Sequence, residues 1–323
     1  MASQRIDMFD VLKGLGIIIV IFRHVYRGFT DPLAIFIREI AMWSVPMFFM
    51  VQGYFMSDAS NWLQSSWKKI RRNYIPYIFW ALAYGAFYWI TIGKTFTVMD
   101  IIFGKTALHL YFMFHYMVFA LLCPLLYLLP KTVRRYFLYF MMLSNVVIIF
   151  ILEISKTYDL HILPFSGPNP LKWWGFVAIG MLLSDYKQIQ QYIAKHAQTF
   201  FYAAIALAVL GLVVPFLNNT LGYMYNKVAI FPLAIGITLT LAIYYGTEYR
   251  PSTKFLSFVG TRTLGIYLGH FFLVDLLRKI LLPGSRALVA IIVLFSCIAA
   301  KDIKDWFLGK MRTAVLNPQY DHL

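Results

Sequence analysis

Asp10-Val-Leu-Lys13-Gly-Leu-Gly-Ile-Ile-Ile-Val-Ile-Phe-Arg23-His24 places a long apolar run between charged residues near the start of the chain. Comparable apolar runs recur further along, among them 200–217 and 287–300. About 20 apolar residues, at a helical rise of about 1.5 Å each, cross the roughly 30 Å hydrocarbon core of a bilayer. The first stretch therefore predicts a membrane-spanning helix, and its recurrence predicts a chain built largely of such helices.

The composition supports a membrane environment for the whole chain. Of its 323 residues 60% are hydrophobic and 13% are charged, whereas soluble domains carry about 25% charged residues. Backbone groups in lipid must be satisfied within the chain, and the runs are too long and too uniformly apolar for barrel strands. We predict an all-α, polytopic transmembrane helical bundle, with residues 1–323 forming a single integral membrane domain and no appended soluble domain.

Hydrophobicity and basic residues together predict the topology. We expect about ten spanning helices, with approximate limits 11–28, 38–57, 74–93, 108–129, 136–154, 171–184, 199–217, 226–246, 256–277 and 283–300. More than half of the 29 lysines and arginines fall on one side of this arrangement. Because cytoplasmic connections are enriched in Lys and Arg, we predict that both termini are cytoplasmic.

Charge and cysteine content exclude several other classes of protein. The net charge is +15, but the cations lie in short connections between apolar segments rather than on a basic arm, which argues against nucleic-acid binding. Cys123 and Cys297 lie inside apolar segments, so a disulfide framework is not expected. No Cys/His metal spacing or phosphate-binding glycine loop occurs in the sequence, and we predict no metal.

Lys13 and His24 are the most informative pair in the first predicted span. They are eleven positions apart, so on a helix they lie within about 20° of one face and about 16 Å apart along the axis. An ionisable residue within a span is costly and is by default functional. The alternative is that Lys13 extends to the headgroups while His24 makes a polar contact near the outer interface.

This pattern resembles the N-terminal signature of the acyltransferase-3 family, a basic residue, ten intervening residues and a histidine in the first membrane helix. The commoner family residue at the position of Lys13 is Arg. Further segments resemble the family in the same order along the chain: Ser44-Val-Pro46-Met-Phe-Phe-Met-Val-Gln-Gly53, the basic loop Lys68-Lys69-Ile-Arg71-Arg72 leading into the third span, His109-Leu-Tyr-Phe, Leu256-Ser-Phe-Val-Gly260 and Leu264-Gly-Ile-Tyr267-Leu-Gly-His270.

The resemblance implies an O-acyltransferase of the bacterial cell membrane. Such enzymes usually move acetyl from cytoplasmic acetyl-CoA to a hydroxyl of a cell-surface or lipid-linked glycan, and succinyl transfer is also known. We therefore expect an acyl-CoA donor and a glycan or lipid-linked saccharide acceptor, no permanently bound cofactor, and a separate extracytoplasmic partner if a further step is needed. The sequence leaves the acceptor and the acyl group open.

His24 is the predicted catalytic residue. A sugar hydroxyl is a poor nucleophile at neutral pH, so acyl transfer to it benefits from a general base. Histidine is suited to this role because its unperturbed pKa of about 6.5 lies near operating pH. Two roles remain open at this point: His24 removes the hydroxyl proton, or it receives the acyl group transiently.

The predicted donor-binding residues are Lys13, Lys68, Arg71 and Arg72, since Lys and Arg commonly bind phosphates and coenzyme A carries several. The family's R-x-x-R pattern matches either Lys68-x-x-Arg71 or Lys69-x-x-Arg72. A purely topological role for these cations is the alternative.

Asp10, Tyr267 and His270 are supporting candidates. Asp10 either orients Lys13 or forms an ordinary surface pair with it, and Tyr267 and His270 either line a pocket or pack in the core. The competing function is that of a transporter or glycan exporter. The sequence does not show the paired Gly/Pro-interrupted helices that are typical of that class.

Overall fold

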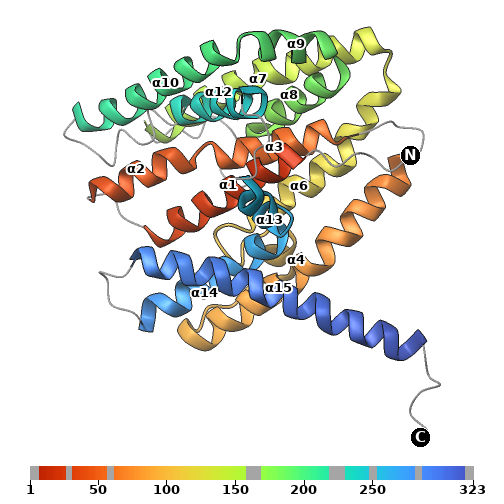
Figure 1. The fold of residues 1–323 in the computed structure, drawn as a ribbon, viewed down its shortest axis with the longest axis vertical. Helices are drawn as coiled ribbons and strands as arrows, with labels where there is room; N and C mark the ends of the chain where they lie inside the picture. The colour runs from red at the N-terminus through yellow and green to blue at the C-terminus, as the bar shows by residue number, and fades with distance from the viewer. Residues whose placement is uncertain are drawn as a thin grey trace, which may run out of the picture.

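The structure, a computed structural model, describes residues 7–26, 31–56, 62–157, 169–217, 230–246, 253–280 and 286–316. All regular elements in these ranges are helices, and no strand occurs in them (Figure 1). The all-α part of the prediction is confirmed.

The α-helices run in chain order with two 3₁₀ helices of note, η2 and η3. Their bounds are α1 (Asp7–Val25), α2 (Pro32–Ala41), α3 (Ser44–Tyr54), α4 (Trp62–Ile92), α5 (Val98–Ile102), α6 (Tyr111–Leu122), η2 (Cys123–Leu128), α7 (Lys131–Thr157), η3 (Pro170–Lys172), α8 (Trp174–Asp185), α9 (Lys187–Lys195), α10 (Ala197–Leu217), α12 (Ile230–Gly246), α13 (Lys254–Gly260), α14 (Thr263–Ile280) and α15 (Arg286–Leu316).

Within the described residues, each predicted span overlaps one helix or two consecutive helices. The segment predicted at 38–57 is divided between α2 and α3, and that at 256–277 between α13 and α14. Within the described ranges three helical stretches are long and apolar enough to cross a membrane, namely Trp62–Ile92, Tyr111–Leu128 and Lys131–Ile149, and Trp174–Asp185 and Arg286–Ala300 are shorter apolar helices. The total of ten spans stays a prediction, and both termini lie outside the described residues.

The basic segment before the third predicted span is helical, so its prediction as a loop is wrong. Helix α4 begins at Trp62 and continues through Lys68–Arg72 and past Pro76 to Ile92. Lys, Arg and Gln have good helix propensity, and no glycine interrupts the segment. Apolarity sets the limits of a predicted span, but it does not report a helix that continues beyond the apolar part.

Helix α1 lies in the middle of the molecule (Figure 1). It contacts α3 and α12 on one side and α13, α14 and α15 on the other. Helices α10 and α12 pack together, and α8 packs between α3 and α7. The central position of α1 means that its two ends face different neighbours, which determines the surroundings of Lys13 and His24.

Two glycines allow α1 and α13 to approach closely. A Cβ on Gly14 would overlap the carbonyl of Leu256, and a Cβ on Gly260 would overlap the carbonyl of Asp10. Small residues at such crossings let two backbones touch inside a membrane, where packing is a main source of association. This contact fixes the start of α14, which follows α13 directly, against the Lys13 end of α1.

Candidate functional site

A cavity of about 540 Å³ lies beside the Lys13 end of α1. Its wall includes residues of α1, α3, α4, α6, α13 and α14. We call it the Lys13 cavity. Its polar and charged wall residues are Lys13, Gln52, Lys69, Arg72, Asn73, Tyr116, Thr261, Thr263 and Tyr267, and its apolar wall includes Phe48, Val51, Phe55, Met56, Phe112, Met113 and Leu264.

Three cations from two helices line this cavity. Lys13 comes from α1, while Lys69 and Arg72 come from neighbouring turns of α4. Lys68 and Arg71 lie on the same helix, are exposed, and are not part of the cavity wall. Of the two registers that the sequence allowed, Lys69-x-x-Arg72 is therefore the one that faces the cavity.

Asp10 holds Lys13 at the cavity. The Lys13 Nζ lies 2.6 Å from Asp10 Oδ1, and the Asp10 side chain is 5% exposed against 28% for Lys13. A surface pair between solvated side chains contributes little, but this carboxylate is buried, and its residue meets Gly260 of α13 through the backbone. The geometry matches the orienting alternative: Asp10 fixes the direction of the lysine, whose ammonium lies at the cavity wall.

The start of α14 adds to the positive character of the cavity. Thr263 is the first residue of α14 and lines the cavity together with Thr261 and Leu264. The N-terminus of an α-helix carries a partial positive charge and unsatisfied N–H groups. With Lys13, Lys69 and Arg72 it forms a site suited to an anion such as a phosphate.

Tyr267 and Phe112 form the inner wall of the Lys13 cavity. Their ring centroids are 5.3 Å apart. The Tyr267 hydroxyl donates to the backbone carbonyl of His109, and its ring centroid lies 5.2 Å from that of His109 and 5.9 Å from that of His270. Tyr267 thus lines the cavity with part of its surface and contacts two histidines with the rest.

Three histidines from distant parts of the chain meet behind this wall. The ring centroids of His24 and His270 are 5.2 Å apart, those of His109 and His270 are 4.9 Å apart, and those of His24 and His109 are 6.2 Å apart. Phe271 packs on His24 and stacks on His109. His109 and His270 are buried, and His24 is partly buried. No group of His, Cys, Asp or Glu in the described ranges has an arrangement that could hold a metal ion.

Backbone contacts assign the tautomer of His270. Its Nδ1 lies 2.7 Å from the carbonyl oxygen of Tyr267 and 3.1 Å from that of Ile266. A carbonyl only accepts hydrogen bonds, so Nδ1 carries the hydrogen and, in the neutral ring, Nε2 carries the lone pair. The preceding turn of α14 therefore orients this ring within the histidine cluster.

Tyr84 supports the same region from α4. Its hydroxyl donates to the carbonyl of Leu268 at 2.9 Å and accepts the N–H of Phe272 at 2.9 Å. Its ring centroid lies 5.3 Å from that of His109. Tyr84 thus connects α4 by two hydrogen bonds to the turn of α14 that carries His270.

The sequence identified only part of this arrangement. Of the predicted site residues, Lys13, Arg72 and Tyr267 line one cavity, and the ring of His24 lies beside that of His270. Lys69 and His109 were not among the predicted site residues, although both lie in segments that resemble the family. Their positions relative to the other residues depend on contacts between α1, α4 and α14, which no local pattern reports.

Comparison with known families adds one finding. The family model described as an acyltransferase domain, acyltransferase-3, matches residues 6–301. That range includes the Lys13 cavity and all three histidines. No curated protein and no solved structure matches the chain.

Proposed function

The chain belongs to the acyltransferase-3 family, and on this basis we propose that it moves an acyl group, in the first instance acetyl from acetyl-CoA, to a hydroxyl of a cell-surface or lipid-linked glycan. The family membership itself supports a membrane acyltransferase.

The Lys13 cavity and the neighbouring cluster of three histidines are the main support for this proposal. Lys13, Lys69, Arg72 and the start of α14 provide positive charge for the phosphates of a coenzyme A thioester. Beyond these cations the wall is mostly apolar, which suits a narrow acyl-bearing arm. Tyr267 lines the cavity and contacts His109 and His270, and His270 in turn contacts His24. A small movement of Tyr267 would bring a thioester in the cavity next to the histidines.

His24 acts as general base in the proposed step. Its imidazole takes the proton of the acceptor hydroxyl while that oxygen bonds to the thioester carbonyl carbon. The carbon–sulfur bond then breaks, its electron pair leaves with sulfur, and the imidazolium returns the proton to the thiolate of coenzyme A. His270 and His109 pack against His24 and hold its ring in place. A base in this position contributes typically about 10²–10⁴-fold to the rate.

The test uses purified protein in lipid nanodiscs with radiolabelled acetyl-CoA. We expect saturable binding of the donor and release of free coenzyme A when an acceptor glycan is added. Lys13→Arg should keep most of the binding because the charge persists, and Lys13→Ala should lose it. A wild-type protein that moves a glycan across the membrane but binds no acyl-CoA would refute the proposal and support the transporter alternative.

A covalent role for His24 predicts a different result in the same experiment. If His24 received the acyl group itself, the protein would become labelled by acetyl-CoA in the absence of acceptor. We expect no stoichiometric label on the protein after rapid denaturation near neutral pH, because acid would hydrolyse an acyl-imidazole. Stoichiometric labelling that His24→Gln abolishes would show the covalent route.

A further inference from the structure

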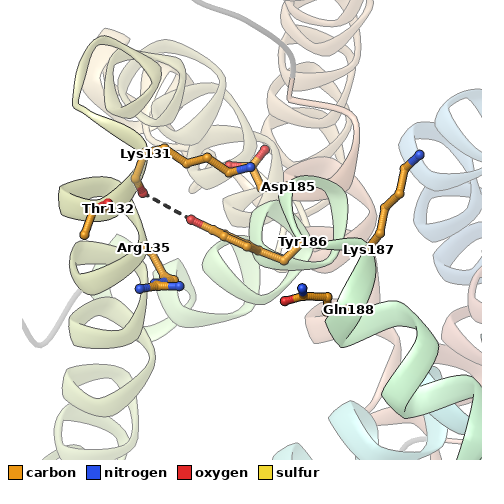
Figure 2. A pocket seen from close by; sticks show the side chains of 7 residues that line it. All are labelled: Lys131, Thr132, Arg135, Asp185, Tyr186, Lys187 and Gln188. Atoms are coloured by element: carbon orange, nitrogen blue, oxygen red, sulfur yellow. Dashed lines mark hydrogen bonds between the residues drawn. The ribbon is translucent and has the colours of Figure 1, made fainter.

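A second cavity, also of about 540 Å³, lies where the first turn of α7 meets the corner between α8 and α9 (Figure 2). We call it the Lys131 cavity. Seven residues line it: Lys131, Thr132, Arg135, Asp185, Tyr186, Lys187 and Gln188. Among the residues that the structure describes, none lines both this cavity and the Lys13 cavity.

The wall of the Lys131 cavity is positively charged. Lys131, Arg135 and Lys187 contribute three cations and Asp185 one carboxylate. That carboxylate already pairs with Arg134, whose Nε lies 2.9 Å from Asp185 Oδ2, and both side chains are only 11% exposed. Because Arg134 neutralises Asp185, the three cations remain to attract an anion.

Tyr186 joins the starts of two helices at this cavity. Its hydroxyl donates to the carbonyl of Lys131, the first residue of α7, at 3.1 Å (Figure 2). Tyr186 also precedes Lys187, the first residue of α9. Both helices therefore direct their positive N-terminal ends towards the cavity. These helix ends reinforce the three cations and favour a ligand with a compact negative charge.

The Tyr186 ring also positions the cations of α7. Lys131 Nζ lies 5.2 Å from its centroid and the Arg135 guanidinium 5.9 Å. In Figure 2 both side chains approach Tyr186 from α7, while Lys187 extends away from Arg135. Cations within about 6 Å of an aromatic face are attracted to it, so Lys131 and Arg135 are held at the cavity rather than dispersed into solvent.

The cavity lies at the level expected for lipid headgroups. Lys131 is the first residue of the candidate span Lys131–Ile149, and Asp185 is the last residue of the apolar helix Trp174–Asp185. The cavity is therefore placed where two apolar helices end at the membrane surface. Phosphates of phospholipids occupy this depth, next to the hydrocarbon core.

An apolar surface continues from the cations along α7. Tyr139, Leu143 and Val146 lie within about 80° of the face that carries Arg135. They are 44%, 68% and 53% exposed, respectively. A cationic end followed by an uncovered apolar face matches a molecule with a phosphate head and a hydrocarbon tail. A soluble phosphate compound has no hydrocarbon tail and would not need the apolar face.

We propose that the Lys131 cavity binds the headgroup phosphate of an anionic phospholipid, whose acyl chain lies along Tyr139, Leu143 and Val146. Lys131 and Arg135 contact the phosphate, and the starts of α7 and α9 support it. The bound lipid thereby bridges α7 to the α8–α9 corner. This site is separate from the Lys13 cavity and does not depend on the proposed acyl transfer.

The test is native mass spectrometry of the detergent-purified chain with equal amounts of phosphatidylglycerol and phosphatidylcholine. We expect the wild type to retain phosphatidylglycerol preferentially. Lys131→Gln/Arg135→Gln should lower that retention by roughly 30-fold, since each cation near a membrane surface contributes about a fivefold factor. The matched control is Lys195→Gln, at the other end of α9 and outside the cavity wall, which should retain lipid as the wild type does.

Two further arms identify the source of the phosphate and guard against misfolding. Inorganic phosphate and adenosine 3′,5′-bisphosphate, at millimolar concentration, should leave the retained phosphatidylglycerol in place. Displacement by either compound would assign the cavity to a soluble phosphate and overturn the proposal. The melting temperature of each variant in phosphatidylcholine nanodiscs should equal that of the wild type. Equal retention by wild type, the double variant and Lys195→Gln would also overturn it.

Discussion

His24 shows how a single residue acquires its surroundings from three parts of the chain. Helical spacing places it on the same face of α1 as Lys13, about 16 Å further along the axis. The fold then packs His270 and Phe271 from α14 and His109 from the segment before α6 around its ring. The ring of His24 is therefore surrounded by aromatic side chains from two other segments of the chain.

Replacing His24 is expected to remove acyl transfer and to spare donor binding. His24→Ala should lower turnover by about 10²–10⁴-fold, the usual contribution of a general base. His24→Gln should fail as well, because an amide forms hydrogen bonds but does not accept a proton at neutral pH. Acetyl-CoA binding and product formation are measured on the same purified variants. Normal turnover by His24→Gln would exclude His24 as the base.

The two basic pairs of α4 provide a matched comparison at the residue scale. Lys69→Gln/Arg72→Gln removes two cavity cations and should raise the apparent dissociation constant of acetyl-CoA at least about tenfold. Lys68→Gln/Arg71→Gln removes the same charge from exposed positions outside the cavity wall and should change it less than about twofold. Isothermal titration of both double variants tests this. Equal losses would mean that only the overall charge matters.

At the scale of elements, the crossing of α1 and α13 connects packing to the site. Gly14 and Gly260 each face a carbonyl of the other helix. Asp10, whose backbone carbonyl meets Gly260, is also the residue whose carboxylate pairs with Lys13. The element that stabilises the bundle therefore also positions a charged group of the Lys13 cavity.

Gly260→Ala is expected to destabilise the protein, because its Cβ would overlap the Asp10 carbonyl and force α13 away from α1. Overpacking of this kind typically costs about 1–3 kcal/mol, seen as a lower melting temperature in detergent, with weaker acetyl-CoA binding through the displaced Lys13. Gly85→Ala in α4 is the control. Its Cβ would meet only Phe96 at 3.8 Å, so its melting temperature should not fall. An unchanged Gly260→Ala protein would contradict the packing argument.

At the scale of the whole molecule, sidedness decides whether the donor reaches its cavity. The proposed function requires Lys69 and Arg72 to face the compartment that supplies acyl-CoA, which is the cytoplasm. The predicted arrangement has more Lys and Arg on the side that carries Lys69 and Arg72, and this excess predicts that the side is cytoplasmic. The proposed function and the predicted topology therefore both require this end of α4 to lie on the cytoplasmic side.

Cysteine labelling tests this orientation. In a variant without Cys123 and Cys297, a cysteine introduced at Lys68 or Arg71, both exposed, should react with a membrane-impermeant maleimide in inside-out vesicles and stay unreactive in intact cells. A reporter fused to the C-terminus should also indicate the cytoplasm. A C-terminus outside the cell would imply an odd number of spans and would refute the ten-span arrangement.

The sequence by itself determined the helical class, the approximate place of most of the described apolar helices, and the shared face of Lys13 and His24. These properties depend on hydrophobicity and on the 3.6-residue period, which are local to one segment. The sequence misplaced the start of α4, because the helix begins at Trp62, before the apolar part of the segment begins.

Only the tertiary structure decided which basic pair of α4 faces the cavity and which histidines join His24. Lys68 and Lys69 are neighbours with the same chemistry, and only the packing of α4 against α6 and α14 distinguishes their directions. His109 and His270 are 161 residues apart in the chain, yet their ring centroids are 4.9 Å apart. Contacts of this kind depend on how whole helices cross, and a helix crossing is fixed by packing along its entire length rather than by any single residue.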